Sequence, residues 1–321
     1  MERTTRRVLI WVAAALAVCA VLFVSLRGCT LMPWNRRTGG GGTVSVKVTR
    51  DFGRAKVRSA SVPFRNGMSV MDALSSTADV QTDYGGGFVT SIQGIGSTSV
   101  EGGPADWFYY VNGVLSDLGA DQFEVGAGDL VWWDLHSWKE GGYLPAVIGA
   151  YPRPFAGGFR DLKDSTLLAG GGMDAVARDA GAYLEGHGAR LTYLHGLQGF
   201  DPGGAAGPTM VITSGREAAA TPWIASLLES PVRGGAFIRL EDDEIVPLDE
   251  EGEPAPIEGE VLAAIVSTGE GMGDDSPVWL VVCRGEQGAR IATAVLLDGG
   301  RLNDMMGAVV DADGTVYGLP R

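Results

Sequence analysis

The sequence predicts an α+β domain followed by an α/β domain, with one N-terminal transmembrane helix before them. Three observations favour this fold class. An uncharged apolar run occupies residues 8–26, short strand patterns surround one helix pattern in residues 43–140, and strand and helix patterns alternate in residues 159–321. A chain of 321 residues is long enough for about two domains of roughly 100 to 200 residues each.

The apolar run VLIWVAAALAVCAVLFVSL, residues 8–26, has nineteen residues without a charge, which is enough to span a bilayer as a helix. A signal peptide usually has a shorter apolar core. We therefore expect a retained single-pass anchor in the cell membrane, with a basic cytoplasmic segment at residues 1–7 and the body outside the cytoplasm. Lipidation at Cys29 is the alternative, because Leu26, Gly28 and Cys29 resemble a bacterial lipoprotein box, although Arg27 departs from it.

Charge and composition limit the class of partner. The formal net charge is −14. Residues 1–37 carry six Arg and one Glu, so the remaining residues carry −19. A phosphate backbone would be repelled by such a body, and no nucleic acid partner is expected. Three Cys predict no disulfide framework.

After a Gly-rich stalk, residues 27–42, period-two patterns begin. A single helix pattern, SVMDALSSTA, has Ser69 as a candidate N-cap. Asn112-Gly113 indicates a tight hairpin. The predicted strands are residues 43–49, 56–64, 88–95, 107–111, 114–118 and 129–135. One helix crossing a mixed sheet of about five strands is typical of a β-grasp-like α+β domain, here residues 43–140.

The series SVPF, GMSVMDAL, GFVTSIQGI, WFYYVNG and GAGDLVWWDLHSW resembles the transcobalamin-like C-terminal domain family over about residues 43–138. This family is a β-grasp domain of bacterial surface proteins and of the vertebrate cobalamin carriers. In the carriers it covers one side of the corrin together with a helical domain. No α/α-barrel pattern exists in this chain, so the resemblance implies half a site at most. It makes cobalamin, or another vitamin-like molecule delivered to an importer, the first ligand candidate.

Aromatic residues alternate along two predicted strands, so rings are expected on both faces of the sheet. One face can be core. The other face is explained by packing against the second domain, by a planar ligand or by a partner protein. The candidate ligand-binding residues are Trp107, Tyr109, Tyr110, Trp132, Trp133, His136 and Trp138. His136 is also a candidate imidazole ligand for a metal or cobalt, although a lone His is more often a hydrogen-bonding surface residue.

A linker rich in Gly and Pro, residues 141–158, leads into the predicted α/β domain, residues 159–321. Its elements alternate, while residues 255–268 are compatible with either a helix or a strand. The predicted strands are 166–169, 189–194, 208–213 and 278–283, the helices 173–184, 217–228 and 288–297, and the hairpins 236–248 and 309–317.

Motifs in the distal half predict little chemistry. Gly170-Gly171-Gly172 lacks the third spaced Gly of a dinucleotide fingerprint and is explained by turn geometry. Ser214, Gly215 and Arg216 join a strand to a helix and form a weak candidate anion site, with Ser214 as N-cap. Residues 268–275, TGEGMGDD, are interpreted as a mobile loop. The sequence has no GxSxG, HExxH or paired CxxC motif, so neither catalysis nor a metal site is expected.

These patterns together predict a membrane-anchored, extracytoplasmic binding protein without enzymatic activity. The ligand is a cobalamin-type corrinoid or another vitamin-like molecule linked to uptake. The alternative is a structural or adhesive surface module, in which the aromatic sheet packs on another protein and no small molecule binds. The sequence leaves the role of the distal half and the oligomeric state open.

Overall fold

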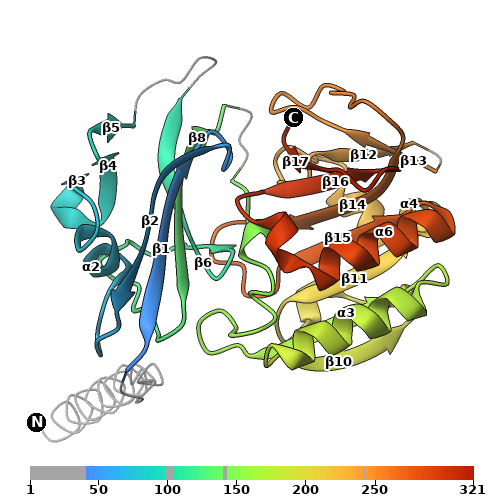
Figure 1. The fold of residues 1–321 in the computed structure, drawn as a ribbon, viewed down its shortest axis with the longest axis horizontal. Coiled ribbons are helices and arrows are strands. Elements are labelled where there is room, and N and C mark those ends of the chain that lie inside the picture. Colours follow the sequence, from blue (N-terminus) through green and yellow to red (C-terminus); the bar gives the residue numbers. More distant parts are fainter. Residues whose placement is uncertain (1–40, 98–103, 140–142, 242) are drawn as a thin grey trace, which may run out of the picture. The chain divides into compact units, whose positions relative to one another are not determined.

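The computed structural model describes residues 41–97, 104–139, 143–241 and 243–321. Residues 37–321 form one compact unit. This unit contains a five-stranded and a seven-stranded sheet, together with smaller sheets of three and two strands (Figure 1). Its short 3-10 helices are η1 (Tyr84–Gly86), η2 (Ile148–Ala150), η3 (Pro202–Gly204) and η4 (Gly299–Leu302).

The five-stranded sheet has the order β2-β1-β8-β6-β7, in which β1 and β8 are parallel and the other neighbours are antiparallel. Alternation in β1 places Val44, Val46 and Val48 in a core with Val70 and Leu74 of the helix α2. The elements of this half are β1 (Thr43–Arg50), β2 (Ala55–Pro63), α2 (Val70–Ser75), β3 (Val80–Asp83), β4 (Phe88–Ile92), β5 (Ile95–Gly96), β6 (Ala105–Val111), β7 (Val114–Leu115) and β8 (Leu130–Ser137).

The seven-stranded sheet has the order β10-β9-β11-β15-β14-β16-β17. Its first four strands are parallel to one another, and the pairs from β15 to β17 are antiparallel. The helices α3 and α6 lie side by side on one face (Figure 1). The elements are β9 (Asp164–Ala169), α3 (Asp174–Gly186), β10 (Arg190–His195), β11 (Thr209–Ser214), α4 (Gly215–Ala220), α5 (Pro222–Leu227), β12 (Ile238–Glu241), β13 (Glu244–Pro247), β14 (Val261–Thr268), β15 (Val278–Cys283), α6 (Gly285–Leu297), β16 (Gly307–Asp311) and β17 (Val316–Leu319).

One hydrophobic core contains residues of both large sheets. Tyr110 and Trp132 of the five-stranded sheet belong to the same buried cluster as Val211, Leu280 and Val309 of the seven-stranded sheet. The second aromatic face of the first sheet is therefore covered within the chain. Hydrophobic burial of this kind explains why residues 37–321 form one unit.

The predicted fold class, an α+β β-grasp-like domain followed by an α/β domain, is wrong as a description of the residues that the structure describes. The structure is a mixed α/β protein dominated by sheets, in which a shared core joins both halves. Among the helices of the described residues, none combines the length and the apolar character needed to cross a membrane. The predicted anchor, residues 8–26, and Cys29 lie outside the described residues.

The structure decides one element of the distal half that the sequence left open, and it differs from the expectation in two helices. Residues 261–268 form the strand β14, every residue of which is buried. The helix predicted over residues 217–228 is two short helices, because Pro222 at the start of α5 cannot donate a backbone hydrogen bond. The predicted helix 288–297 begins earlier, at Gly285, whose φ of 61° is in the left-handed region that suits glycine.

Candidate functional site

The aromatic candidates of β6 and β8 lie in two cores on opposite faces of the five-stranded sheet, as their alternation predicts. Trp107, Tyr109 and Trp133 pack in the core around α2. Tyr110 and Trp132 pack in the core shared with the seven-stranded sheet and are fully buried. Their rings fill the protein interior rather than an open groove.

His136 is buried as well, with 1% of its surface exposed, although a lone His was expected at the surface. Its ring stacks on Phe52 at 4.9 Å and on Phe108 at 4.5 Å between ring centroids. His136 Nδ1 lies 3.3 Å from Asp134 Oδ2. Its Nε2 has no hydrogen-bond partner in the described part of the chain. A ligand that is to reach this imidazole must first enter the shared core.

Asp134 anchors a buried polar network beside His136. Its Oδ1 accepts hydrogen bonds from Thr49 Oγ1 at 2.8 Å and from the Gly53 amide at 3.0 Å. Thr49 Oγ1 in turn accepts the indole N–H of Trp132 at 2.7 Å. Buried polar groups need such partners. The indole N–H of Trp132 is therefore satisfied within the protein, without a ligand.

Trp138 differs from the other candidates because it is only partly buried. Its indole N–H donates to Asp106 Oδ2 at 2.8 Å. Trp138 follows β8, and Asp106 lies in the paired strand β6. The bond therefore fixes the end of the strand pair, and the ring is not brought together with the buried aromatic candidates.

Ser214, Gly215 and Arg216 lie where predicted, between β11 and α4. Ser214 Oγ accepts the Glu217 N–H at 3.3 Å and so caps the helix. The approach of Gly171 is so close that a Cβ there would lie 2.5 Å from Ser214 Oγ. The hydroxyl is thus occupied by a structural role. The helix α4 has only six residues, and Arg216 is exposed.

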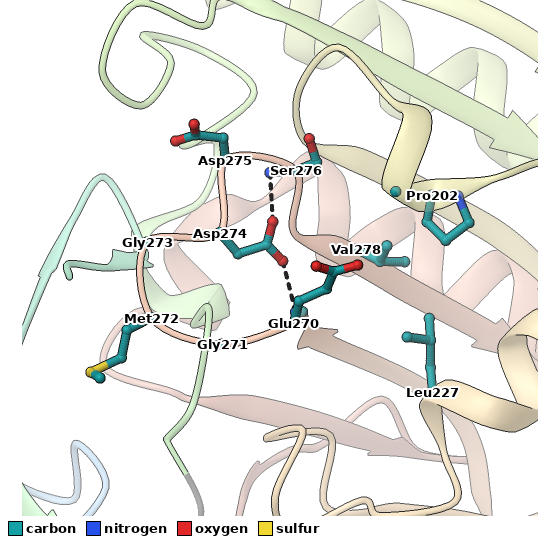
Figure 2. A pocket seen from close by; sticks show the side chains of 12 residues that line it. Pro202, Leu227, Glu270, Gly271, Met272, Gly273, Asp274, Asp275, Ser276 and Val278 are labelled. Atoms are coloured by element: carbon teal, nitrogen blue, oxygen red, sulfur yellow. Dashed lines mark hydrogen bonds between the residues drawn. The ribbon is translucent and has the colours of Figure 1, made fainter.

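A pocket of about 420 Å³ lies at the loop between β14 and β15, residues 269–277. We call this loop the acidic loop because it carries Glu270, Asp274 and Asp275. Figure 2 shows the Glu270 side chain directed into the hollow, toward Val278 and Pro202, and the Met272 side chain directed away from it. Leu227 at the end of α5 completes the apolar wall.

The shape of the acidic loop is fixed by one carboxylate. Asp274 Oδ2 accepts the Glu270 N–H at 2.9 Å, and Asp274 Oδ1 accepts the Ser276 N–H at 2.8 Å (Figure 2). Because both oxygens of Asp274 hold the backbone, Glu270 is left as the carboxylate that faces the pocket. No hydrogen bond or ion pair of the Glu270 carboxylate is found within the described residues.

The acidic loop is bonded to the strand β7 and to Arg160. The Gly273 amide donates to the Leu115 carbonyl at 2.8 Å. Arg160 forms an ion pair with Asp117 and another, at 3.4 Å, with Asp275. Burial raises the pKa of Asp275, and the charge of Arg160 opposes that shift. These contacts hold the loop at its middle and at its end, and its interpretation as mobile stays a prediction.

This arrangement suits a ligand with a cationic group and an apolar body. Pockets for small ligands usually measure about 300 to 1,000 Å³ and combine apolar walls with a few polar groups. Glu270 supplies the negative charge, and Leu227 and Val278 supply apolar contact. No group of three or more His, Cys, Asp or Glu able to hold a metal is found where the structure is described.

Sequence reasoning missed this pocket because its walls come from three distant segments. The acidic loop alone carried a signal, since Gly269, Gly271 and Gly273 alternate with residues that include Glu270 and Asp274. Nothing in the local pattern indicates that Pro202 and Leu227 lie opposite Glu270. That proximity follows from the order of the sheet.

Comparison with known proteins assigns part of the first half. Residues 67–137 match the model of a domain of unknown function, DUF4430. None of the curated proteins matches the chain. Among solved structures, a protein from Ruminococcus gnavus ATCC 29149, for which metal binding has been proposed, is 18% identical, with a TM-score of 0.22. The match covers 29% of this chain and 95% of that one. A likeness at this level carries no argument about fold or function.

Proposed function

We propose that this protein is a non-catalytic binding protein and that its ligand site is the pocket at the acidic loop. The observation that carries the proposal is the Glu270 carboxylate, which faces a pocket of about 420 Å³ while the neighbouring carboxylates are engaged in the loop. An organic cation with an apolar body matches this combination. Its positive group would pair with Glu270 and its body would contact Leu227 and Val278.

A finer proposal rests on the resemblance to the transcobalamin-like C-terminal domain family, which favours a corrinoid or another vitamin-like ligand. The buried rings of Tyr110 and Trp132 offer no surface on which a corrin could stack. A corrinoid would therefore bind outside these buried rings, as half of a site completed by another molecule. A position outside the cytoplasm and a link to an importer stay predictions, because residues 8–26 are not described.

Two nucleophilic side chains support a role without catalysis. Burial raises the pKa of the Cys283 thiol to about 12, so the reactive thiolate is suppressed. The Ser214 hydroxyl caps α4, and no hydrogen bond joins it to a His among the described residues. A nucleophile needs an adjacent base to act at neutral pH.

The test is calorimetric titration of the full chain with benzyltrimethylammonium, and in parallel with cyanocobalamin and cobinamide. Saturable binding of the cation that weakens by about tenfold or more in Glu270→Gln would support the site, because a charged contact contributes about 1.5 to 3 kcal/mol. The control is Glu286→Gln, which removes an exposed carboxylate on α6. Corrinoid binding that is unchanged in Glu270→Gln would place that ligand elsewhere, and no binding of any probe would overturn the proposal.

A surface-interaction role is the second candidate, and one observation favours it. Tyr84 is 91% exposed and Phe88 is 40% exposed, and their rings contact edge to face at 6.1 Å between centroids. Exposed aromatic pairs of this kind are typical of contact surfaces. If this role is correct, Tyr84→Ser should abolish adhesion of cells that carry the chain while leaving small-molecule titrations unchanged.

A further inference from the structure

A second pocket, which shares no lining residue with the pocket at the acidic loop, lies between α3 and the edge strand β10. It measures about 240 Å³. Leu167 and Ala169 of β9 and Ala177 of α3 form an apolar base, and Tyr193 of β10 forms a wall. Gly181 of α3 makes room for this ring, because a Cβ there would clash with the Tyr193 hydroxyl.

The pocket lies at the carboxyl ends of two parallel strands, β9 and β10. From β9 the chain passes to β10 on one side, and the next strand, β11, pairs with β9 on the other side. The strand order therefore reverses between β9 and β11, next to the pocket, and open α/β sheets bind ligands outside the carboxyl ends of their strands. Ala169 and His195 are the last residues of β9 and β10, so the pocket opens at that edge.

Three polar side chains surround the apolar base. His195 Nδ1 lies 2.8 Å from Asp174 Oδ1, which fixes the orientation of the imidazole and leaves Nε2 for another partner. Arg178 stands four residues after Asp174 on α3. The Asp174 carboxylate contacts His195 instead of Arg178, and no ion pair or hydrogen bond of the Arg178 guanidinium is found in the described ranges. Arg178 therefore keeps its donors free.

We propose that this pocket is a second binding site, for a small carboxylate with an aromatic or short aliphatic tail. A guanidinium forms paired hydrogen bonds with a carboxylate. The His195 imidazole lines the same pocket as Arg178, and the tail packs on Leu167, Ala169 and Ala177. The volume of about 240 Å³ lies just below the usual range for ligand pockets, so one ring or a short chain fills it.

The experiment follows amide chemical shifts of the isotope-labelled full chain during titration with benzoate, and with benzyl alcohol as the neutral probe of similar shape. Saturable shifts for benzoate are expected in α3 and β10. Arg178→Gln should weaken benzoate binding by about tenfold or more and leave benzyl alcohol unaffected. His195→Gln should also weaken benzoate binding. The control, Arg290→Gln, removes an exposed Arg on α6.

The outcomes separate this site from the pocket at the acidic loop. Glu270→Gln should leave benzoate binding unchanged, because Glu270 belongs to the other pocket. Benzoate shifts that are absent from α3 and β10, or that are equal in Arg178→Gln and in the unmodified chain, would overturn the proposal. Equal affinity for benzoate and benzyl alcohol would also overturn it, since the pocket would then recognise only the apolar ring.

Discussion

Asp304 forms ion pairs with two lysines from the strands β1 and β2. Its carboxylate lies 3.0 Å from Lys47 Nζ and 2.7 Å from Lys56 Nζ. Burial alone would raise the pKa of Asp304, but the two lysines outweigh it and the pKa is lowered. Burial also lowers the pKa of Lys47, and Asp304 offsets only part of that shift. The ion pair therefore sets the direction of the pKa shift of Asp304, whereas burial sets that of Lys47.

Asp304→Asn should reduce the free energy of unfolding at pH 7 by roughly 1 to 3 kcal/mol, because it leaves the half-buried Lys47 without its partner. A carboxyl group whose folded pKa is lowered stabilises the fold above its unfolded pKa, and this contribution is lost as the pH falls through the folded pKa. The difference between the two proteins should therefore shrink below the usual Asp value of 3.8. Urea denaturation at pH 7 and at pH 3 measures it.

The matched control for this ion pair is Asp161→Asn, since Asp161 is exposed. It should leave stability nearly unchanged at both pH values. A loss in Asp304→Asn that stayed constant from pH 7 to pH 3 would show that packing, and not charge, links Asp304 to the five-stranded sheet.

Gly273 meets two requirements of the acidic loop at once. Its φ is 75°, and a Cβ on this residue would clash with the Asp117 carboxyl group. Gly273→Ala should therefore cost more than the roughly 1 kcal/mol that a left-handed backbone alone costs a residue with a side chain. Gly67→Ala is the matched control, with a φ of 72° and open space around the Cβ. Thermal unfolding of both variants compares them, and equal losses would mean that Asp117 moves aside freely.

At the scale of elements, α2 shows how a short helix is fixed by its first residue. Ser69 Oγ accepts the Asp72 N–H, and Asp72 Oδ2 accepts the Ser69 N–H, both at 3.0 Å. The sequence predicted Ser69 as the N-cap, and this prediction is confirmed. Because α2 has only six residues, both bonds matter for its start.

Ser69→Ala should reduce the free energy of unfolding by about 1 kcal/mol, the usual cost of losing an N-cap hydroxyl. Chemical denaturation measures the loss. Ser75→Ala, at an exposed position at the end of the same helix, should be neutral or slightly stabilising because Ala favours helix. If both variants lost the same free energy, the cap would contribute nothing specific.

The sequence predicted best those elements whose signals are local. Alternation in β1 and the Asn112-Gly113 turn between β6 and β7 identified their elements, because both signals are local. For residues 255–268, local sequence could not decide between a helix and a strand, since a fully buried strand and a buried helix have the same apolar composition. The pocket residues could not be grouped from sequence for the same reason, as Leu227 and Glu270 meet only after the sheet has formed.

At the scale of the whole molecule, the question is what covers the second aromatic face of the five-stranded sheet. A planar ligand, a partner protein and the distal half were all compatible with rings on both faces. Phe52 contacts Phe237 edge to face at 6.0 Å, and Trp132 belongs to the core that includes Val309. Packing within the chain therefore accounts for this face, and ligand contact through its rings would require the core to open.

A shared core should make the two halves unfold together. Trp107 belongs to the core around α2 rather than to the shared core, and its N–H donates to the Ile95 carbonyl at 3.2 Å. Trp107→Ala should cost about 3 to 5 kcal/mol. If unfolding is cooperative, that loss must also appear as faster hydrogen exchange of the buried amides in β15, in the distal half. Tyr84→Ala, which removes an exposed ring, serves as the control. Faster exchange confined to β6 and β8 would show that the halves unfold separately, and that the shared core holds two independently stable sheets in contact.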